Sequence, residues 1–101
     1  MIIISGILRV SAEDREKVFN LVAPLISASL AEGGCNEYGF WEDPAQPGSI
    51  RIFEEWASQE ALDSHFATAH MAEFMSQMGS LKIEAMDLFR YESEIKKPLF
   101  G

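Results

Sequence analysis

The stretch Cys35–Ala57, CNEYGFWEDPAQPGSIRIFEEWA, contains two runs rich in aromatic and β-branched residues around a cluster of proline and glycine. Such a pattern predicts two antiparallel strands joined by a turn. Side chains alternate along a strand, so the even-numbered residues from Ile50 to Trp56 share one face and Phe53 lies on the other. Both faces carry large apolar groups, and we expect both to be covered.

The segment before this hairpin predicts a strand followed by a helix. Ile2–Val10 is almost continuously apolar, which is typical of a central strand buried on both faces. Ser11–Asp14 has the spacing of a capping box, in which Ser11 and Asp14 bind each other's backbone amides. Apolar residues then recur at helical spacing, which predicts a helix over Ala12–Glu32 that is kinked at Pro24 and ends at two glycines.

The segment after the hairpin predicts a second helix and a last strand. Ser58 is a good N-cap for a helix that carries both histidines of the chain, and a strand is expected over Leu81–Glu92. The order strand, helix, strand, strand, helix, strand indicates an α+β, ferredoxin-like βαββαβ fold with an antiparallel sheet. We therefore expect one domain over residues 1–92 and a C-terminal tail over residues 93–101.

The second face of the sheet also needs a cover. Phe53 and Trp41 are expected on it, opposite the face that carries Trp56. Apolar groups on an uncovered face are usually buried against a partner, and two sheets can pack face to face. The sequence predicts a homodimer in which two sheets meet.

Charge and cysteine content exclude several classes of partner. The chain has 16 acidic and 8 basic residues, and a net charge of -8 disfavours nucleic acids and anionic membrane surfaces. The lone Cys35 can form no internal disulfide, and the N-terminal segment lacks the features of a signal peptide. No apolar run approaches the length of about 18 to 20 residues that spans a bilayer. We expect a cytoplasmic protein with neither nucleic-acid nor membrane partners.

His65 and His70 are five residues apart, which decides how a metal site is judged. At 100° per residue on one continuous helix they fall on opposite sides of an apolar stripe, whereas a shared metal favours a spacing of four. We therefore predict no metal site, unless the helix breaks near Thr68. No glycine-rich phosphate loop is present either, so no cofactor is expected. His65 borders the stripe and is either a structural histidine or a base near neutral pH.

A group of large side chains could form either a plain core or an apolar pocket. This group comprises Tyr38, Trp56, Phe66, Phe74, Met71, Met75 and Met78. Glu54 is expected on the same strand face as Trp56, as a buried carboxylate. It requires a partner such as Arg9 or Arg90, or it is an acid or base with a raised pKa.

The run Glu32–Phe74 resembles the antibiotic biosynthesis monooxygenase family. The matching elements are E-G-C, a tyrosine-bearing strand, a D-P turn, E-x-W, A-L-x-x-H and a second histidine, seen here from Glu32 to His70. The resemblance implies a dimeric α+β barrel. It also implies one of several activities, because the family includes quinol and anthrone monooxygenases without metal or flavin, haem-degrading oxygenases and an isomerase.

Within that family the chain is most similar to the quinol monooxygenase type. The resemblance implies an enzyme without cofactors that oxidises a small aromatic substrate of the quinol or anthrone type with O2. It implies His65, Trp56 and Glu54 as catalytic residues, with His65 as the first candidate for the base and Glu54 as the second. We predict that the substrate is bound in the cleft between helices and sheet by Tyr38, Phe66, His70 and Phe74. Two alternatives remain: a non-catalytic module that binds a small hydrophobic molecule, and an isomerase or lyase acting on a small carbonyl compound.

Overall fold

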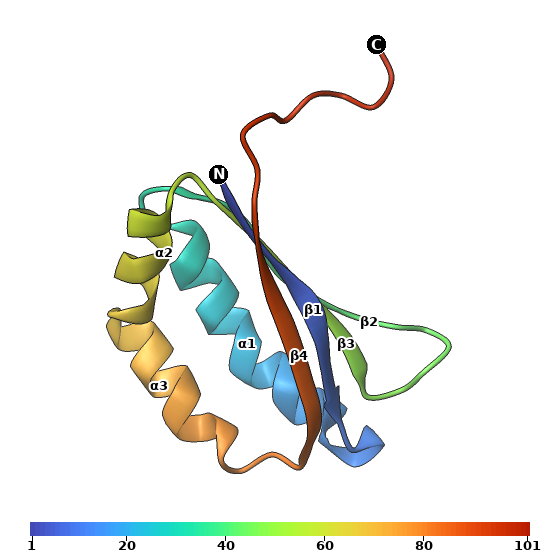
Figure 1. Cartoon of the computed structure of the whole chain (residues 1–101). Helices are drawn as coiled ribbons and strands as arrows, with labels where there is room; N and C mark the ends of the chain where they lie inside the picture. The colour runs from blue at the N-terminus through green and yellow to red at the C-terminus, as the bar shows by residue number, and fades with distance from the viewer.

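Four antiparallel strands form one sheet in the order β2-β3-β1-β4. The strands are β1 (Ile2–Val10), β2 (Cys35–Glu42), β3 (Ser49–Trp56) and β4 (Ile83–Glu92). The computed structural model describes all residues from Met1 to Gly101, and it places every α-helix on the same face of this sheet (Figure 1). The ferredoxin-like α+β fold expected from the sequence is confirmed, as is the central position of the first strand.

The central strand β1 is buried on only one face within the single chain. Ile4 and Leu8 point toward the helices and are buried, whereas Ile3 and Ile7 on the other face are only partly covered. The prediction of a strand buried on both faces is therefore wrong for one chain, because no layer of this chain covers the second face. The apolar side chains of Ile3 and Ile7 can therefore contact another molecule.

The first helix begins later than predicted. A 3-10 turn, η1 (Ala12–Asp14), precedes α1 (Arg15–Leu30), and Pro24 lies within α1 without dividing it. The predicted capping box is wrong, because Ser11 makes no side-chain cap bond. Asp14 Oδ2 instead accepts a hydrogen bond from the Lys82 amide at 2.8 Å. The carboxylate thus ties the start of the first helix to the segment that precedes β4.

The second helical region is divided, which contradicts the single helix expected from the sequence. It consists of α2 (Gln59–Phe66) and α3 (Ala69–Met78). Ser58 caps α2 as predicted, its hydroxyl accepting from the Ala61 amide at 3.2 Å. Thr68 caps α3 by accepting from the Met71 amide at 3.3 Å, while its hydroxyl donates to the His65 carbonyl at 2.7 Å. The Thr68 side chain replaces backbone bonds at both helix ends, so the axis can change direction there.

The turn after α1 fixes the position of Glu32 relative to α2. Gly34 has a φ of 86°, which favours glycine, and its carbonyl accepts from the Ala57 amide at 2.8 Å. A Cβ at Gly34 would lie 2.7 Å from Ala61 Cβ, so the turn and the first turn of α2 approach too closely for a side chain. This close approach places Glu32 beside the helical segment that carries the histidines.

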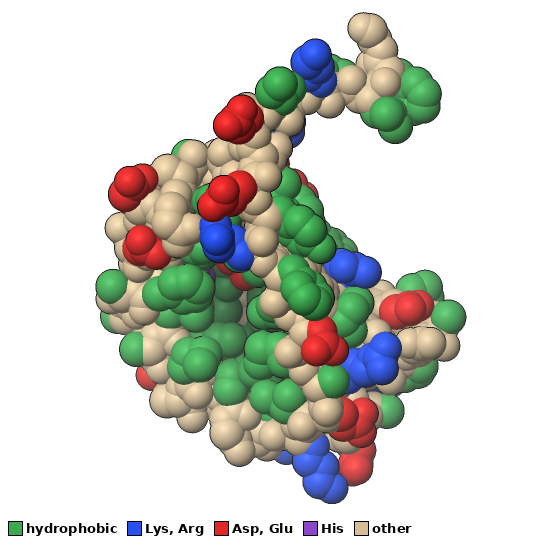
Figure 2. Space-filling view, in the orientation of Figure 1, with side chains coloured by type: hydrophobic (Ala, Val, Ile, Leu, Met, Phe, Trp, Pro, Cys, Tyr) green, Lys and Arg blue, Asp and Glu red, His purple; other side chains and the backbone are tan.

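The helical layer leaves one edge of the sheet open. Leu8 and its partner Met86 face the helices together, since they are paired across β1 and β4. Leu8 is buried but Met86 is 46% exposed. Figure 2 shows a hollow with apolar walls between the helices and β4. The interior of the fold is therefore accessible from the β4 side.

The outer face of the sheet is uncovered except near Glu55, whose Oε2 lies 3.3 Å from Lys96 Nζ of the C-terminal segment. Large apolar residues exposed on the outer face are Trp41, Phe89 and Tyr91. Residues after Glu92 contain neither helix nor strand and extend away from the body (Figure 1). None of the helices combines the length and hydropathy required to cross a bilayer.

Candidate functional site

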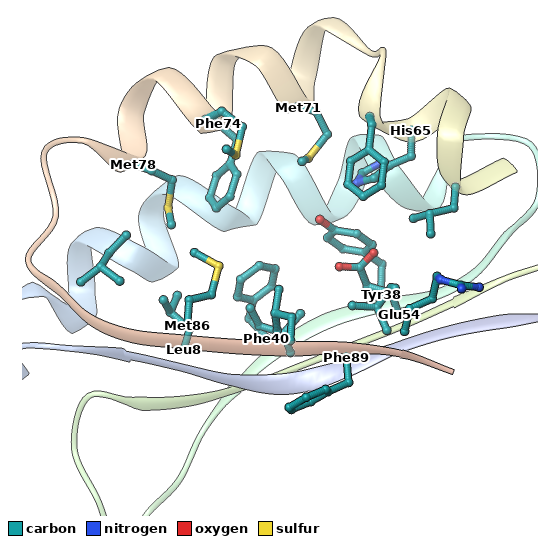
Figure 3. Close-up of a pocket in the computed structure, with 18 of the residues that line it drawn as sticks. Leu8, Tyr38, Phe40, Glu54, His65, Met71, Phe74, Met78, Met86 and Phe89 are labelled. Carbon is teal, nitrogen blue, oxygen red and sulfur yellow. The ribbon is translucent and has the colours of Figure 1, made fainter. Parts of the chain in front are cut away.

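A pocket of about 540 Å³ lies between the sheet and the helices α2 and α3. Fifteen of its 19 lining residues are hydrophobic. In Figure 3 one wall descends from α3 with Met71, Phe74 and Met78, and the facing wall rises from the strands with Leu8, Phe40 and Met86. An apolar cavity of this size matches the usual form of a site for a small organic ligand.

Polar groups gather at one end of this pocket, below α2. Tyr38 on β2 and Glu54 on β3 point up from the sheet, and His65 points down from α2 toward them (Figure 3). A few convergent polar groups in an apolar cavity are the usual device for orienting a ligand and acting on it. This polar end is the candidate functional site.

His65 is the most buried of these polar residues, with 1% exposure. Its Nδ1 lies 2.7 Å from Glu32 Oε2, and its ring packs against Trp56 and Tyr38 at centroid distances of 4.6 Å and 5.3 Å. An ionised carboxylate can only accept, so in the neutral ring Nδ1 carries the proton and Nε2 keeps its lone pair. Since Nε2 has no protein partner and the residue lines the pocket, it is free to accept a proton from a ligand.

Glu54 is a buried carboxyl group without a cationic partner. Its Oε1 accepts a hydrogen bond from Trp56 Nε1 at 3.0 Å, and burial raises the pKa of Glu54 to about 7. The predicted pairing with Arg9 or Arg90 is wrong; Arg90 bonds to Gln59 and Glu92 instead. The geometry agrees with the other alternative, a carboxyl group that can hold or release a proton near neutral pH.

Two other ionisable groups near the site stay protonated. Burial, reinforced by the negative charge of Glu54, raises the pKa of Tyr38 far above its usual range, so its hydroxyl can donate a hydrogen bond to a ligand. Burial, together with the charges of Glu32 and Glu54, raises the pKa of Cys35 to about 11. A thiol in this state is a poor nucleophile, in agreement with a structural role for Cys35.

His70 reaches the same carboxylate from the other side of the helical layer. Its Nε2 lies 2.7 Å from Glu32 Oε2, the oxygen that also contacts His65. The prediction that the two imidazoles diverge is wrong, because the break at Thr68 turns the second histidine back toward the first. His70 lines a separate groove of about 220 Å³ between α1 and α3, and it does not line the main pocket.

This convergence raises the question of a metal, since nitrogen and oxygen atoms of Glu32, His65 and His70 lie within 4.8 Å of one another. A zinc ion binds such ligands at about 2.0 to 2.2 Å, which separates tetrahedral ligand atoms by roughly 3.4 Å. Here a single oxygen lies 2.7 Å from each nitrogen. That is the spacing of hydrogen bonds, so the arrangement is a hydrogen-bonded triad and does not fit a metal cage.

The remaining residues expected at the site fall into two groups. Phe66 and Phe74 line the pocket. Trp56 is fully buried and does not line the pocket, but it contacts both His65 and Glu54. The sequence interpretation missed Glu32 as a partner of both histidines, and it also missed that Gln59 and Arg90 line the pocket. The position of Glu32 just before two glycines was the available signal, because a chain reversal there turns the glutamate toward the next layer.

Comparison with known proteins places this chain in one family. The sequence profile described as "Antibiotic biosynthesis monooxygenase" matches residues 1–77. The Synechocystis protein sll1783 is 31% identical over 91 residues, which are 90% of this chain and 62% of that protein, so the chain spans less than two thirds of this relative. A Bacillus subtilis protein named "Putative monooxygenase YcnE" is 27% identical over 91% of this chain and 97% of its own length.

A solved structure supports the same relationship across the complete chain. The crystal structure of a "putative antibiotic biosynthesis monooxygenase" from Deinococcus radiodurans superposes with a TM-score of 0.89, at 28% identity and with 100% of both chains covered. Its coverage includes β4, which lies beyond the residues that the profile matches. This chain belongs to the antibiotic biosynthesis monooxygenase family.

Proposed function

We propose that this protein is a monooxygenase without a cofactor that oxidises a small planar aromatic compound of the quinol or anthrone type with O2. The observation that carries the proposal is the arrangement of His65. Its Nδ1 is held by Glu32 at 2.7 Å, and its Nε2 is left without a partner in an apolar pocket. A buried imidazole held in this way is suited to take a proton from a bound hydroxyl or activated C–H group.

The shape and polarity of the pocket favour a planar aromatic substrate. About 540 Å³ of mostly apolar space between aromatic and methionine side chains can hold one to three fused rings. The polar groups are confined to one end, where the Tyr38 hydroxyl and the Glu54 carboxyl can bind an oxygen substituent. A ligand with oxygen on one edge and an apolar body fits this division.

The chemistry requires no flavin or metal when the substrate supplies the electrons. His65 Nε2 takes a proton, and the resulting electron-rich anion reduces O2 and forms a bond from a ring carbon to oxygen. The His65 imidazolium returns its proton to the peroxide. Cleavage of the O–O bond then leaves one oxygen atom in the product and releases the other as water, as the substrate loses its second proton to the Glu54 carboxylate. Glu54, whose pKa of about 7 leaves it partly protonated at neutral pH, can donate that proton to the departing oxygen. Both electrons for the water come from the substrate.

Oxygen consumption tests the proposal. Wild-type protein, freed of metals by a chelator and without added flavin, is mixed with a panel of quinols, naphthoquinols and anthrones. We expect O2 uptake faster than the uncatalysed autoxidation for at least one compound. Ligand-induced stabilisation without O2 uptake would indicate a binding module instead, and product formation under strict anaerobiosis would indicate isomerase or lyase chemistry on a carbonyl compound.

We also propose that the protein is a homodimer joined through the outer faces of two sheets. Large apolar side chains lie on that face of three strands, as at Trp41, Phe53 and Phe89, and Trp41 and Phe89 are 50% and 60% exposed. The Phe89 ring points to the side of the sheet opposite the helices (Figure 3). Sedimentation should give a dimer at micromolar concentration, and a stable monomer would contradict this arrangement.

A further inference from the structure

One carboxylate oxygen serves two histidines that face different surroundings. Glu32 Oε2 lies 2.7 Å from His65 Nδ1 and 2.7 Å from His70 Nε2. The side-chain exposure rises from 1% at His65 to 13% at Glu32 and 26% at His70. The three residues therefore connect the pocket to the groove between α1 and α3, on a side of the helical layer that a ligand in the pocket does not occupy.

The charge of the cluster limits how many protons it can hold. Glu32 supplies one negative charge, which balances one imidazolium. A second imidazolium would lie with its ring centroid only 5.9 Å from the first, in a partly buried setting that screens the repulsion poorly. The protonation of one histidine therefore disfavours the protonation of the other, so the two rings titrate as a coupled pair.

We propose that Glu32, His65 and His70 form a proton-exchange unit that takes a proton from the pocket at His65 and releases one to solvent at His70. The coupling between the two rings exists without any reaction. That the unit accepts a proton from a substrate rests on the proposed function. Glu32 and His70 then act as positioning residues, because they act on the substrate through His65.

The protons balance without any change at the carboxylate. Before the reaction His70 is the imidazolium, and His65 is neutral with its proton on Nδ1. The substrate transfers a proton to His65 Nε2, which forms the second imidazolium. His70 then loses its Nδ1 proton to water, and both hydrogen bonds to Glu32 Oε2 remain. The cluster keeps the same charge, with one imidazolium now at His65. When His65 returns its proton to the reduced oxygen, His70 takes one back from water, so the unit is reset and the cycle releases no net proton.

Other ionisable groups lie near the cluster or line the two cavities that it connects. They are Cys35 and Tyr38 on β2, Glu54 on β3, Glu73 on α3 and Arg90 on β4. The first two stay neutral. Glu54 changes charge near neutral pH and would perturb His65 on its own. The experiments are therefore run in the wild type and also in Glu54→Gln, which removes that ionisation.

Nitrogen NMR of the imidazoles tests the unit directly, because the chain contains only 2 histidines. Long-range ¹H–¹⁵N spectra of protein without a histidine tag report the tautomer and the protonation of each ring as pH changes. We expect His65 to carry its proton on Nδ1 when neutral. In His70→Gln the His65 signals should change at higher pH than in the wild type, because a neighbouring positive charge is removed, and in Glu32→Gln they should change at lower pH. A His65 midpoint that is the same in His70→Gln, or an Nε2–H tautomer, would overturn the proposal.

A zinc titration separates this unit from a metal site. Imidazole spectra of the wild type are recorded in one sample with a chelator and in another, free of chelator, with one equivalent of Zn²⁺. The signals are expected to be the same in both. Stoichiometric conversion of both rings to metal-bound shifts would overturn the hydrogen-bonded triad.

Turnover provides the second readout once a substrate is found. The acid limb of the pH–rate profile should move to higher pH in His70→Gln and to lower pH in Glu32→Gln, whereas a merely structural role would lower the rate without moving the limb. If NMR shows the coupled pair but no quinol is oxidised, the proposed function fails and the coupling stands. If oxidation proceeds and the two rings titrate independently, the unit is wrong and the proposed function stands.

Discussion

The two ends of the pocket differ in how their side chains are held. At the polar end His65 and Glu54 each have a specific hydrogen-bond partner, Glu32 and Trp56. At the apolar end the walls are flexible or aromatic side chains such as Phe74 and Met86, next to the open β4 edge. Hydrogen bonds fix the orientation of a side chain and the position of its proton. Apolar contacts contribute to ligand affinity and depend little on direction. Changes at the polar end should therefore alter rate and pH dependence, and changes at the apolar end should alter substrate affinity.

The largest effect is expected for His65→Gln. Loss of the base should lower kcat by ~10² to 10⁴, while KM changes little. Glutamine retains a polar group that can bond to Glu32. An alanine would instead leave the Glu32 carboxylate without this partner, next to a cavity. Steady-state oxygen uptake measures the effect, with circular dichroism and sedimentation as controls for folding and assembly. An unchanged kcat would remove His65 as the base and make Glu54 the next candidate.

The next effect concerns stability and pH at Glu54. Its pKa is raised from 4.5 to about 7, so the folded state binds this proton more tightly than the unfolded chain. Stability from this group is therefore fully present below pH 4.5 and is lost as pH rises to about 7. Between about pH 5 and pH 8 the loss is roughly 2 to 3 kcal/mol, at 1.36 kcal/mol per pKa unit.

Glu54→Gln should remove this loss. Urea unfolding at the two pH values is expected to show that the variant gains stability relative to wild type on going from the lower to the higher pH. An equal difference between the two proteins at both pH values would contradict a raised pKa for Glu54.

A smaller effect is expected in the turn that supports the polar end. In Gly34→Ala a Cβ would meet Ala61 Cβ at 2.7 Å, at a residue whose φ is 86°. We expect a stability loss of about 1 to 3 kcal/mol and a lower kcat, since the turn must shift and move Glu32. Gly33→Ala is the matched control, because a Cβ there has no atom within 4 Å. Equal stability and kcat in the two variants would show that the close approach at Gly34 does not position Glu32.

The smallest effect is expected at the apolar end. Met86 lines the pocket but is 46% exposed, so Met86→Ala should remove part of the substrate contact at little cost to folding. Loss of apolar contact of this size raises KM about tenfold, while kcat stays within about a factor of two. Leu99→Ala, in the exposed C-terminal segment, is a control outside the pocket. A large fall in kcat for Met86→Ala would contradict the division between the two ends.

The sequence predicted those parts of the fold that depend on local patterns. Alternating side chains and a Pro-Gly cluster predicted the hairpin of β2 and β3, and Ser58 predicted the start of α2. The break at Thr68 was named only as an exception and not predicted, because apolar residues keep helical spacing on both sides of it. The signal was the side chain of Thr68, which can cap a new helix as well as sit inside a continuous one.

The partner of the histidines could not be found from local patterns. Glu32 is separated from His65 by 33 positions and from His70 by 38. Periodicity relates only residues on one helix or strand, whereas this contact depends on how the turn at Gly34 packs against α2. Burial of Glu54, in contrast, followed from its place on the Trp56 face of β3, so the second acid–base candidate was predictable.

Oxygen labelling tests the central claim most directly. Metal- and flavin-free protein is incubated with an accepted substrate under ¹⁸O2, and the product is analysed by mass spectrometry alongside a hydrogen peroxide assay. The account predicts one labelled oxygen atom in each product molecule, no stoichiometric peroxide, and loss of the enzymatic rate in His65→Gln. A product without label, or one peroxide released for each substrate oxidised, would contradict a monooxygenase reaction at the polar end of this pocket.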